Sequence, residues 1–176
     1  LALTTHYSNV NDALNLFDDT RLKFEQGSQF NYSTYGTVLL SAVMQEAAGQ
    51  PFLELMQEQV FTPLELDQTG EESKFEGQGL LASFYWNDGG KSNKVRVWRD
   101  VDLSHRLAGG GFVSSSSDLV RLGNAYFSEQ FISAETKRKM WTPQPLLNGE
   151  INRQNYGIGW RVNQLVVGNK TVDYMH

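Results

Sequence analysis

Apolar residues recur at helical spacing near the start of the chain and predict a short amphipathic helix over residues 9–17. Ser8 or Asn9 can cap this helix. Its apolar side chains fall on one face and comprise Val10, Ala13, Leu14 and Phe17. Residues 18–31 are charged and contain Gly27 and Ser28, and this composition predicts a loop that leads to Phe30.

A stronger helical pattern covers residues 35–48, followed by Gly49 in the position of a left-handed cap. Pro51 fits the first turn of a second helix, where its missing N–H is harmless, and Pro63 ends that helix. The two helices are expected to form a hairpin with apolar faces made of Val38, Leu39, Ala42, Val43 and Ala47, and of Phe52, Leu53, Met56 and Val60.

The middle of the chain changes to polar and glycine-rich sequence. Residues 67–94 predict a long excursion with one strand near Leu80–Trp86. Gly89-Gly90 predicts a turn, and the alternation over Lys94–Trp98 predicts a returning strand.

The last third of the chain combines helices with a strand pair. One helix follows Asp118 and runs through Phe127, and another runs from Ser133 to Trp141, before two prolines. From Tyr156 to His176 the pattern predicts two antiparallel strands around a turn at Gly168-Asn169.

Composition and charge narrow the function classes. The chain has 176 residues, 40% apolar, with a net charge of −5, which suits one domain or most of one and disfavours a nucleic-acid binder. It has no cysteine, and no apolar run approaches the ~20 residues of a membrane helix. Leu1 is not an initiating methionine and His176 falls within a strand-like run, so we expect both ends to be cut.

Three functional motifs find no support in the sequence. Gly109-Gly110-Gly111 lacks the lysine of a phosphate-binding loop, so close backbone packing before a helix is the favoured interpretation. Histidines occur only at 6, 105 and 176, without metal-ligand spacing, and we predict no metal. A Gly-x-Ser-x-Gly elbow is absent.

The most informative stretch is residues 30–36, Phe-Asn-Tyr-Ser-Thr-Tyr-Gly, at the entry to the long helix. Tyr32 precedes Ser33 and Thr34, either of which can cap exposed N–H groups. From the residues alone, packing is the favoured role of this tyrosine.

Four segments of the chain keep the order of a known family. They are Phe30–Gly49 continuing into Pro51-Phe52-Leu53, Ala108–Ser114 with Asp118-Leu119, Met140–Pro143, and Tyr156–Trp160. Together they resemble the class C β-lactamase-like serine hydrolases, a family that includes D-alanyl-D-alanine carboxypeptidases and esterases. The Tyr-Ser-Thr and Trp-Thr-Pro versions are most similar to the mitochondrial-type subgroup and its bacterial relatives. The resemblance implies an α+β fold of the β-lactamase/transpeptidase type, in which helices flank an antiparallel sheet, and it makes residues 1–176 part of a single domain.

The family's three motifs match this chain to different degrees. Its Ser-x-x-Lys motif has no match, since no serine is followed by lysine three positions later; we therefore expect the nucleophile to lie upstream and the isolated chain to be inactive. The tyrosine motif falls on Tyr32, with Thr34 in place of the commoner asparagine as a substrate-binding residue. His176 matches the first residue of a His-x-Gly version of the last motif.

The implied activity is acyl-enzyme hydrolysis of peptide, ester or β-lactam carbonyls without metal or cofactor. Tyr32 would be the base, helped by cations such as the absent lysine and a protonated His176. The expected partner is a small-molecule or peptide substrate, while the oligomeric state stays open. The family favours a periplasmic or secreted location, with cytoplasmic or mitochondrial alternatives.

A non-catalytic scaffold or binding protein is the second hypothesis. The missing Ser-x-x-Lys and the threonine at position 34 both motivate it. An intact Ser-x-x-Lys upstream of Leu1 would favour the enzyme.

Overall fold

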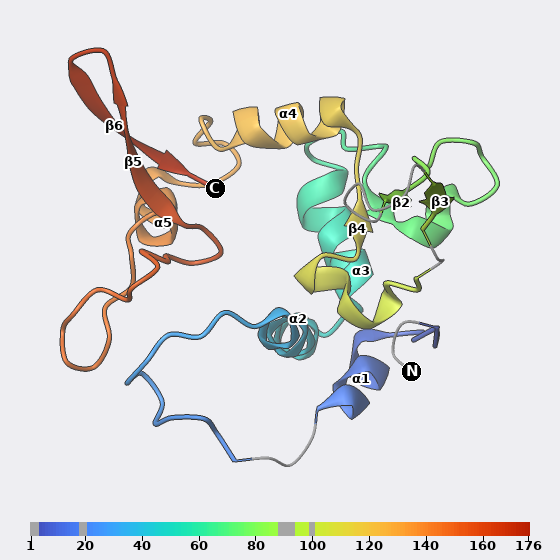
Figure 1. Ribbon diagram of the computed structural model, residues 1–176, viewed down its shortest axis with the longest axis horizontal. Helices are drawn as coiled ribbons and strands as arrows, with labels where there is room; N and C mark the ends of the chain where they lie inside the picture. Colours follow the sequence, from blue (N-terminus) through green and yellow to red (C-terminus); the bar gives the residue numbers. More distant parts are fainter. Residues whose placement is uncertain (1–3, 18–20, 88–93, 99–100) are drawn as a thin grey trace. The chain divides into compact units, whose positions relative to one another are not determined.

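The computed structural model describes residues 4–17, 21–87, 94–98 and 101–176 (Figure 1). The chain divides into two compact units. The first unit comprises Leu1–Asp18 and Ser33–Leu119, and the second comprises Asp19–Tyr32 and Val120–His176. Each unit is described by itself.

Three helices build the core of the first unit: α1 (Val10–Ala13), α2 (Thr34–Ala48) and α3 (Phe52–Met56). Asn9 caps α1 by accepting a hydrogen bond from the Asp12 N–H, and a 3-10 turn continues α1 over Leu14–Leu16. The predicted helix over 9–17 is therefore present, although its last turn is tighter. The buried core cluster consists of Val10, Ala13, Val38, Ala42, Phe52 and Leu107.

The ends of α2 follow the sequence signals. Ser33 caps the first turn through its Oγ, which accepts from the Gly36 N–H at 3.1 Å. Gly49 ends the helix with φ +67°, and its N–H donates to the Gln45 carbonyl. The predicted apolar face is partly wrong, because Leu39 and Val43 are exposed.

The second helix is shorter than its apolar pattern predicts. Pro51 is its cap and Phe52 its buried anchor, as expected. From Gln57 to Phe61 the chain forms a turn of π-helix, which ends before Pro63. Phe61 is buried against Phe112, at 5.4 Å between ring centroids, a contact that the helical pattern did not include.

Short strands complete the first unit. β1 (Gly70–Glu71) pairs with β4 (Phe112–Val113), and neither strand was predicted. β2 (Tyr85–Asn87) pairs with β3 (Val95–Val97) in the antiparallel order predicted for the returning strand. The turn predicted at Gly89-Gly90 lies outside the described residues.

The polar loop before β1 is tied to the start of α4 (Ser116–Ala125) by a buried carboxylate. Asp118 is 1% exposed and accepts hydrogen bonds from the Gln68 N–H at 2.9 Å and the Thr69 hydroxyl at 2.8 Å. A buried carboxylate is stable only when hydrogen-bonded, so these donors fix where α4 begins.

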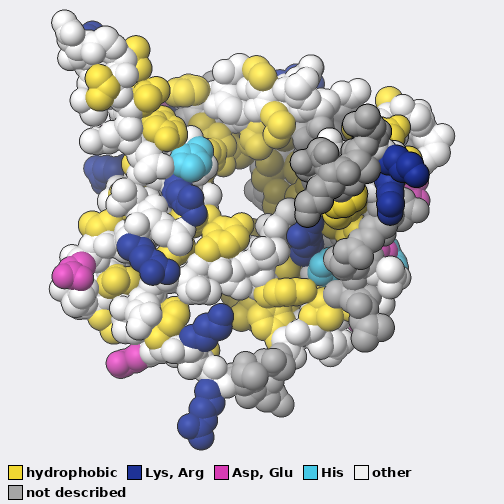
Figure 2. All heavy atoms as spheres, in the orientation of Figure 1, with side chains coloured by type: hydrophobic (Ala, Val, Ile, Leu, Met, Phe, Trp, Pro, Cys, Tyr) yellow, Lys and Arg dark blue, Asp and Glu magenta, His cyan; other side chains and the backbone are white. Residues whose placement is uncertain are grey.

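The second unit contains α5 (Ala134–Met140) and a hairpin of β5 (Val162–Val167) and β6 (Lys170–Met175). Ser133, where the sequence predicted the helix to begin, is the cap of α5, and Gly168 supplies the hairpin turn with φ +60°. The hairpin is the red ribbon of Figure 1. Figure 2 shows apolar side chains along it, and the exposed ones are Leu165, Val166, Val167, Val172 and Tyr174.

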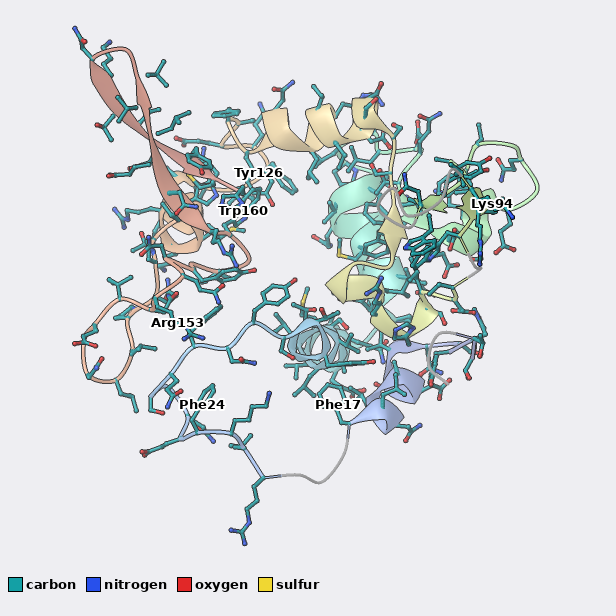
Figure 3. All side chains as sticks on the ribbon, viewed as in Figure 1. Phe17, Phe24, Lys94, Tyr126, Arg153 and Trp160 are labelled. Atoms are coloured by element: carbon teal, nitrogen blue, oxygen red, sulfur yellow. The ribbon has the colours of Figure 1, made fainter. Side chains whose placement is uncertain are left out.

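An aromatic cluster holds α5 to the end of α4 and to the segment before β5. Tyr126 packs edge-on against Trp160 at 5.2 Å and Phe131 at 5.7 Å, and Trp141 lies 6.1 Å from Tyr126. Figure 3 shows Tyr126 and Trp160 side by side. Burial raises the pKa of the Tyr126 phenol because a buried phenolate loses its hydration.

The α+β class predicted from the sequence is confirmed. The strands are antiparallel throughout the described ranges, where they form three separate two-stranded sheets. Among the described residues, no helix has the length and apolar character needed to cross a bilayer.

Candidate active site

Tyr32 lies in the second unit, at the end of the loop before α2, and its side chain is 55% exposed. Its ring meets Tyr156 edge-on, with centroids 6.2 Å apart, and Phe30 packs on the same Tyr156 at 5.0 Å. The phenol therefore has an aromatic support on one side while most of its surface faces solvent.

Asn152 holds the loop that carries Tyr156. It is 2% exposed, and its Nδ2 donates to the carbonyls of Gln144 (2.9 Å) and Tyr156 (2.8 Å). Its Oδ1 accepts from the N–H groups of Tyr156 (2.9 Å) and Gln154 (3.3 Å). One buried side chain thus fixes both backbone polar groups of Tyr156. Asn152 could not be singled out from the sequence, because an asparagine in a polar loop carries no signal of burial.

His176 follows β6 and continues the hairpin register. Its N–H donates to the Arg161 carbonyl at 3.0 Å, and the Arg161 N–H donates back at 2.8 Å. The imidazole stacks on Tyr174 with ring centroids 5.5 Å apart, and its Nε2 lies 2.8 Å from the Asn163 Nδ2.

A single backbone segment connects the surroundings of Tyr32 and His176. Tyr156, which supports Tyr32, forms an isolated antiparallel bridge with Arg161. Arg161 in turn pairs with His176 through two backbone hydrogen bonds. Within the described residues, no hydrogen bond or ring contact joins Tyr32 to His176 directly.

Thr34 is the first residue of α2 and belongs to the first unit. Its carbonyl accepts from the Thr37 hydroxyl at 2.6 Å, while its own hydroxyl makes no hydrogen bond within the described part of the chain. That hydroxyl is therefore not committed to the protein's own backbone. The binding role of Thr34 stays a prediction.

The glycine triplet packs against the start of α2. A Cβ on Gly109 would lie 2.6 Å from Thr34 Cγ2 and 2.8 Å from the Thr34 carbonyl oxygen. One on Gly111 would lie 2.7 Å from the Leu103 carbonyl oxygen, and Gly110 has φ +120°. Close backbone approach explains this motif, as predicted.

A second pair of motif segments meets in the second unit. A Cβ on Gly157 would overlap the Met140 carbonyl oxygen and lie 3.0 Å from that of Thr142. The Ile158 N–H donates to the Met140 carbonyl at 2.9 Å. The Tyr-Gly-x-Gly-Trp segment is therefore seated directly on the Trp-Thr-Pro corner, where only glycine fits.

Comparison with known proteins identifies the family of this chain. The Beta-lactamase family model matches residues 2–173, and the chain belongs to this family. It is 33% identical over 178 residues to the mouse protein "Serine beta-lactamase-like protein LACTB, mitochondrial", covering 92% of this chain and 32% of that protein.

Solved structures share the fold. The penicillin binding protein from Bacillus halodurans matches with a TM-score of 0.71 and 22% identity over 93% of this chain and 49% of its own. EstCE1, a hydrolase with promiscuous acyltransferase activity, matches with a TM-score of 0.70 and 21% identity over 92% of this chain and 48% of its own. The β-lactamase/transpeptidase-like fold predicted from the sequence is thus confirmed.

The chain spans about a third of the length of the curated relatives that it matches. The activity and substrates of the whole protein are therefore proposals. The name of the mouse relative is compatible with the mitochondrial alternative, and a periplasmic location stays a prediction.

Proposed function

We propose that this chain is the base-carrying part of a serine hydrolase that works through an acyl-enzyme on peptide, ester or β-lactam carbonyls. Tyr32 is the general base, His176 lies at the end of the same unit, and Thr34 offers a hydroxyl to the substrate. The serine nucleophile comes from a Ser-x-x-Lys motif elsewhere in the longer protein.

The observation that carries this proposal is the exposure of Tyr32. A tyrosine that serves only packing buries its ring and, where possible, hydrogen-bonds its hydroxyl. Tyr32 instead has 55% of its side chain exposed while its ring edge rests on Tyr156. A phenol held in position and open to solvent can meet a serine supplied by another stretch of polypeptide.

The proton transfer needs a cation beside the phenol. A serine hydroxyl requires a base at hydrogen-bond distance, and an unperturbed tyrosine has a pKa of about 10. The lysine of the Ser-x-x-Lys motif would supply that cation. That lysine would favour the phenolate, which accepts the serine proton and returns it to the leaving group.

A fluorophosphonate probe tests whether the serine nucleophile lies outside residues 1–176. The longer protein should be labelled covalently at one serine, because its activated hydroxyl attacks phosphorus and displaces fluoride. Residues 1–176 alone should stay unlabelled and should not hydrolyse a chromogenic ester or cephalosporin. Labelling or turnover by the isolated chain would contradict the proposal that the nucleophile lies elsewhere.

The scaffold hypothesis makes the opposite prediction for the longer protein. A non-catalytic member would remain unlabelled although it is folded. The threonine at position 34, where asparagine is commoner in the family, is the observation that keeps this second candidate. The same labelling experiment therefore separates the two functions.

A further inference from the structure

The first unit contains a cavity of about 880 Å³. Its walls come mainly from residues 71–73 and Glu76, from residues 81–86 with Val97 and Trp98, and from residues 101–104 with Arg106 and Leu107. Neither Tyr32, Thr34 nor His176 lines it. The volume is at the upper end of the range for small-molecule sites, enough for a ligand the size of a short peptide.

One wall of the cavity is aromatic. The Trp98 N–H donates to the Phe84 carbonyl at 2.7 Å, and Trp86 is two residues further along β2. Strand alternation therefore puts Phe84, Trp86 and Trp98 on the same face of the hairpin. All three line the cavity, and they remain 71%, 44% and 43% exposed. Such rings favour an apolar or aromatic ligand group.

Another wall of the cavity carries a cation. Arg106 lines the cavity, and its Nε is buried without a hydrogen-bond partner. Its guanidinium makes no ion pair within the part of the chain that the structure describes. A planar guanidinium is well suited to a carboxylate.

Several carboxylates line the same cavity. Glu71, Glu72 and Glu76 contribute to its walls, and none of them forms an ion pair with another described residue. The fourth acid, Asp102, is already engaged by His6 at 3.0 Å and by Ser104. The three glutamates are therefore available to an ammonium group, while Arg106 is available to a carboxylate.

We propose that this cavity binds a zwitterionic short peptide with apolar side chains. Arg106 takes the terminal carboxylate, the acids at 71, 72 and 76 take the terminal ammonium, and the aromatic wall takes the side chains. A simple anion would face three carboxylates, and a simple cation would leave Arg106 without a counter-charge. Only a ligand with both charges and an apolar body matches every wall.

Calorimetric titration of residues 1–176 with leucyl-phenylalanine tests the proposal. The dipeptide should bind with a Kd below about 1 mM. Its C-terminal amide, which lacks the carboxylate, and its N-acetyl form, which lacks the ammonium, should each bind at least about tenfold more weakly. Equal binding of all three, or no binding of the dipeptide, would overturn the proposal.

Variants assign the two charges. Arg106→Gln should weaken the dipeptide about tenfold and make it equal to its amide, whereas Arg106→Lys should restore part of the difference. Glu72→Gln should reduce the preference over the N-acetyl form. Lys74→Gln removes a cation of the same unit that does not line the cavity and whose Nζ lies over the Phe75 ring; it is the control and should bind normally. Unchanged selectivity in Arg106→Gln, with normal circular dichroism, would contradict the assignment.

This inference goes beyond the proposed hydrolase activity and is separable from it. Tyr32→Phe should bind the dipeptide with the affinity of the unmodified chain, because Tyr32 does not line the cavity. Failure of either proposal therefore leaves the other unaffected.

Discussion

At the scale of single residues, the motif glycines act through excluded space. A Cβ on Gly157 would meet the backbone oxygens of Met140 and Thr142. A Cβ on Gly109 would meet the side chain and the carbonyl oxygen of Thr34. Glycine's lack of a side chain was enough to predict close packing for the triplet at 109–111. The opposing atoms could not be predicted, because they come from segments far along the chain.

Gly157→Ala should lower the free energy of unfolding by about 2–4 kcal/mol, because the new methyl displaces backbone rather than a flexible side chain. Gly123→Ala is the matched control in the same unit. Gly123 lies within α4, and no atom lies within 4 Å of the position that its Cβ would take, so alanine should stabilise by about 0.5–1 kcal/mol. Urea unfolding of both variants measures the difference, and equal stability of the two would contradict the packing at Gly157.

Asp102 should make the free energy of unfolding depend on pH. Burial alone would raise the pKa of its carboxyl, but hydrogen bonds from Ser104 and His6 outweigh this and lower the pKa. A carboxyl with a lowered folded-state pKa adds stability above its unfolded pKa, about 3.9, and this is lost as the pH falls. The unfolding free energy of Asp102→Asn should therefore approach that of the unmodified chain below about pH 4.

The control for this prediction is Glu135→Gln, which removes an exposed pair with Lys139. Surface pairs of this kind contribute little, so this variant should follow the unmodified chain from about pH 7 to about pH 3 apart from a small constant offset. A gap between Asp102→Asn and the unmodified chain that does not narrow in acid would refute the role assigned to Asp102.

At the scale of elements, helices with clear ends were predictable and short strands were not. Asn9, Ser33, Gly49 and Ser133 all act as caps in the structure, since capping depends on local residues. β1 and β4 are only two residues long and come from distant parts of the chain, where Gly70 pairs with Val113. No local pattern encodes such a pairing.

The same limit applies to the supports of Tyr32. The sequence predicted a loop that leads to Phe30 but not the ring on which Phe30 packs, which is Tyr156. Tyr156 in turn is held by Asn152, a polar residue in a loop. Polar residues in loops are mostly exposed, so only the folded chain reveals this one as buried.

Asn152→Ala should destabilise the second unit by about 2–4 kcal/mol, because it removes a buried side chain and leaves the partly buried Gln144 carbonyl and Tyr156 N–H without their protein partner. Asn148→Ala is the control from the same loop, since Asn148 is exposed and bonds mainly to Glu150; it should cost less than about 1 kcal/mol. Thermal unfolding measures both. A loss at Asn148 as large as that at Asn152 would contradict the anchoring role.

At the scale of the whole molecule, the chain is a family member that covers only part of its relatives. It matches the Beta-lactamase family over residues 2–173 but spans 32% of the mouse relative. The family could be identified from the sequence because four segments keep their order, a property that does not require knowledge of packing. The exposure of Tyr32 and the charged cavity of the first unit could not, since both depend on contacts between distant segments.

Steady-state hydrolysis of a chromogenic ester by the longer protein tests the central claim most directly. Tyr32→Phe should lower kcat/KM about 10²- to 10⁴-fold, the usual contribution of a general base, while leaving the unfolding transition unchanged. Tyr35→Phe removes a neighbouring phenol that packs near Phe17 and should retain the original kcat/KM. If Tyr32→Phe hydrolyses the ester as fast as Tyr35→Phe, Tyr32 is not the base.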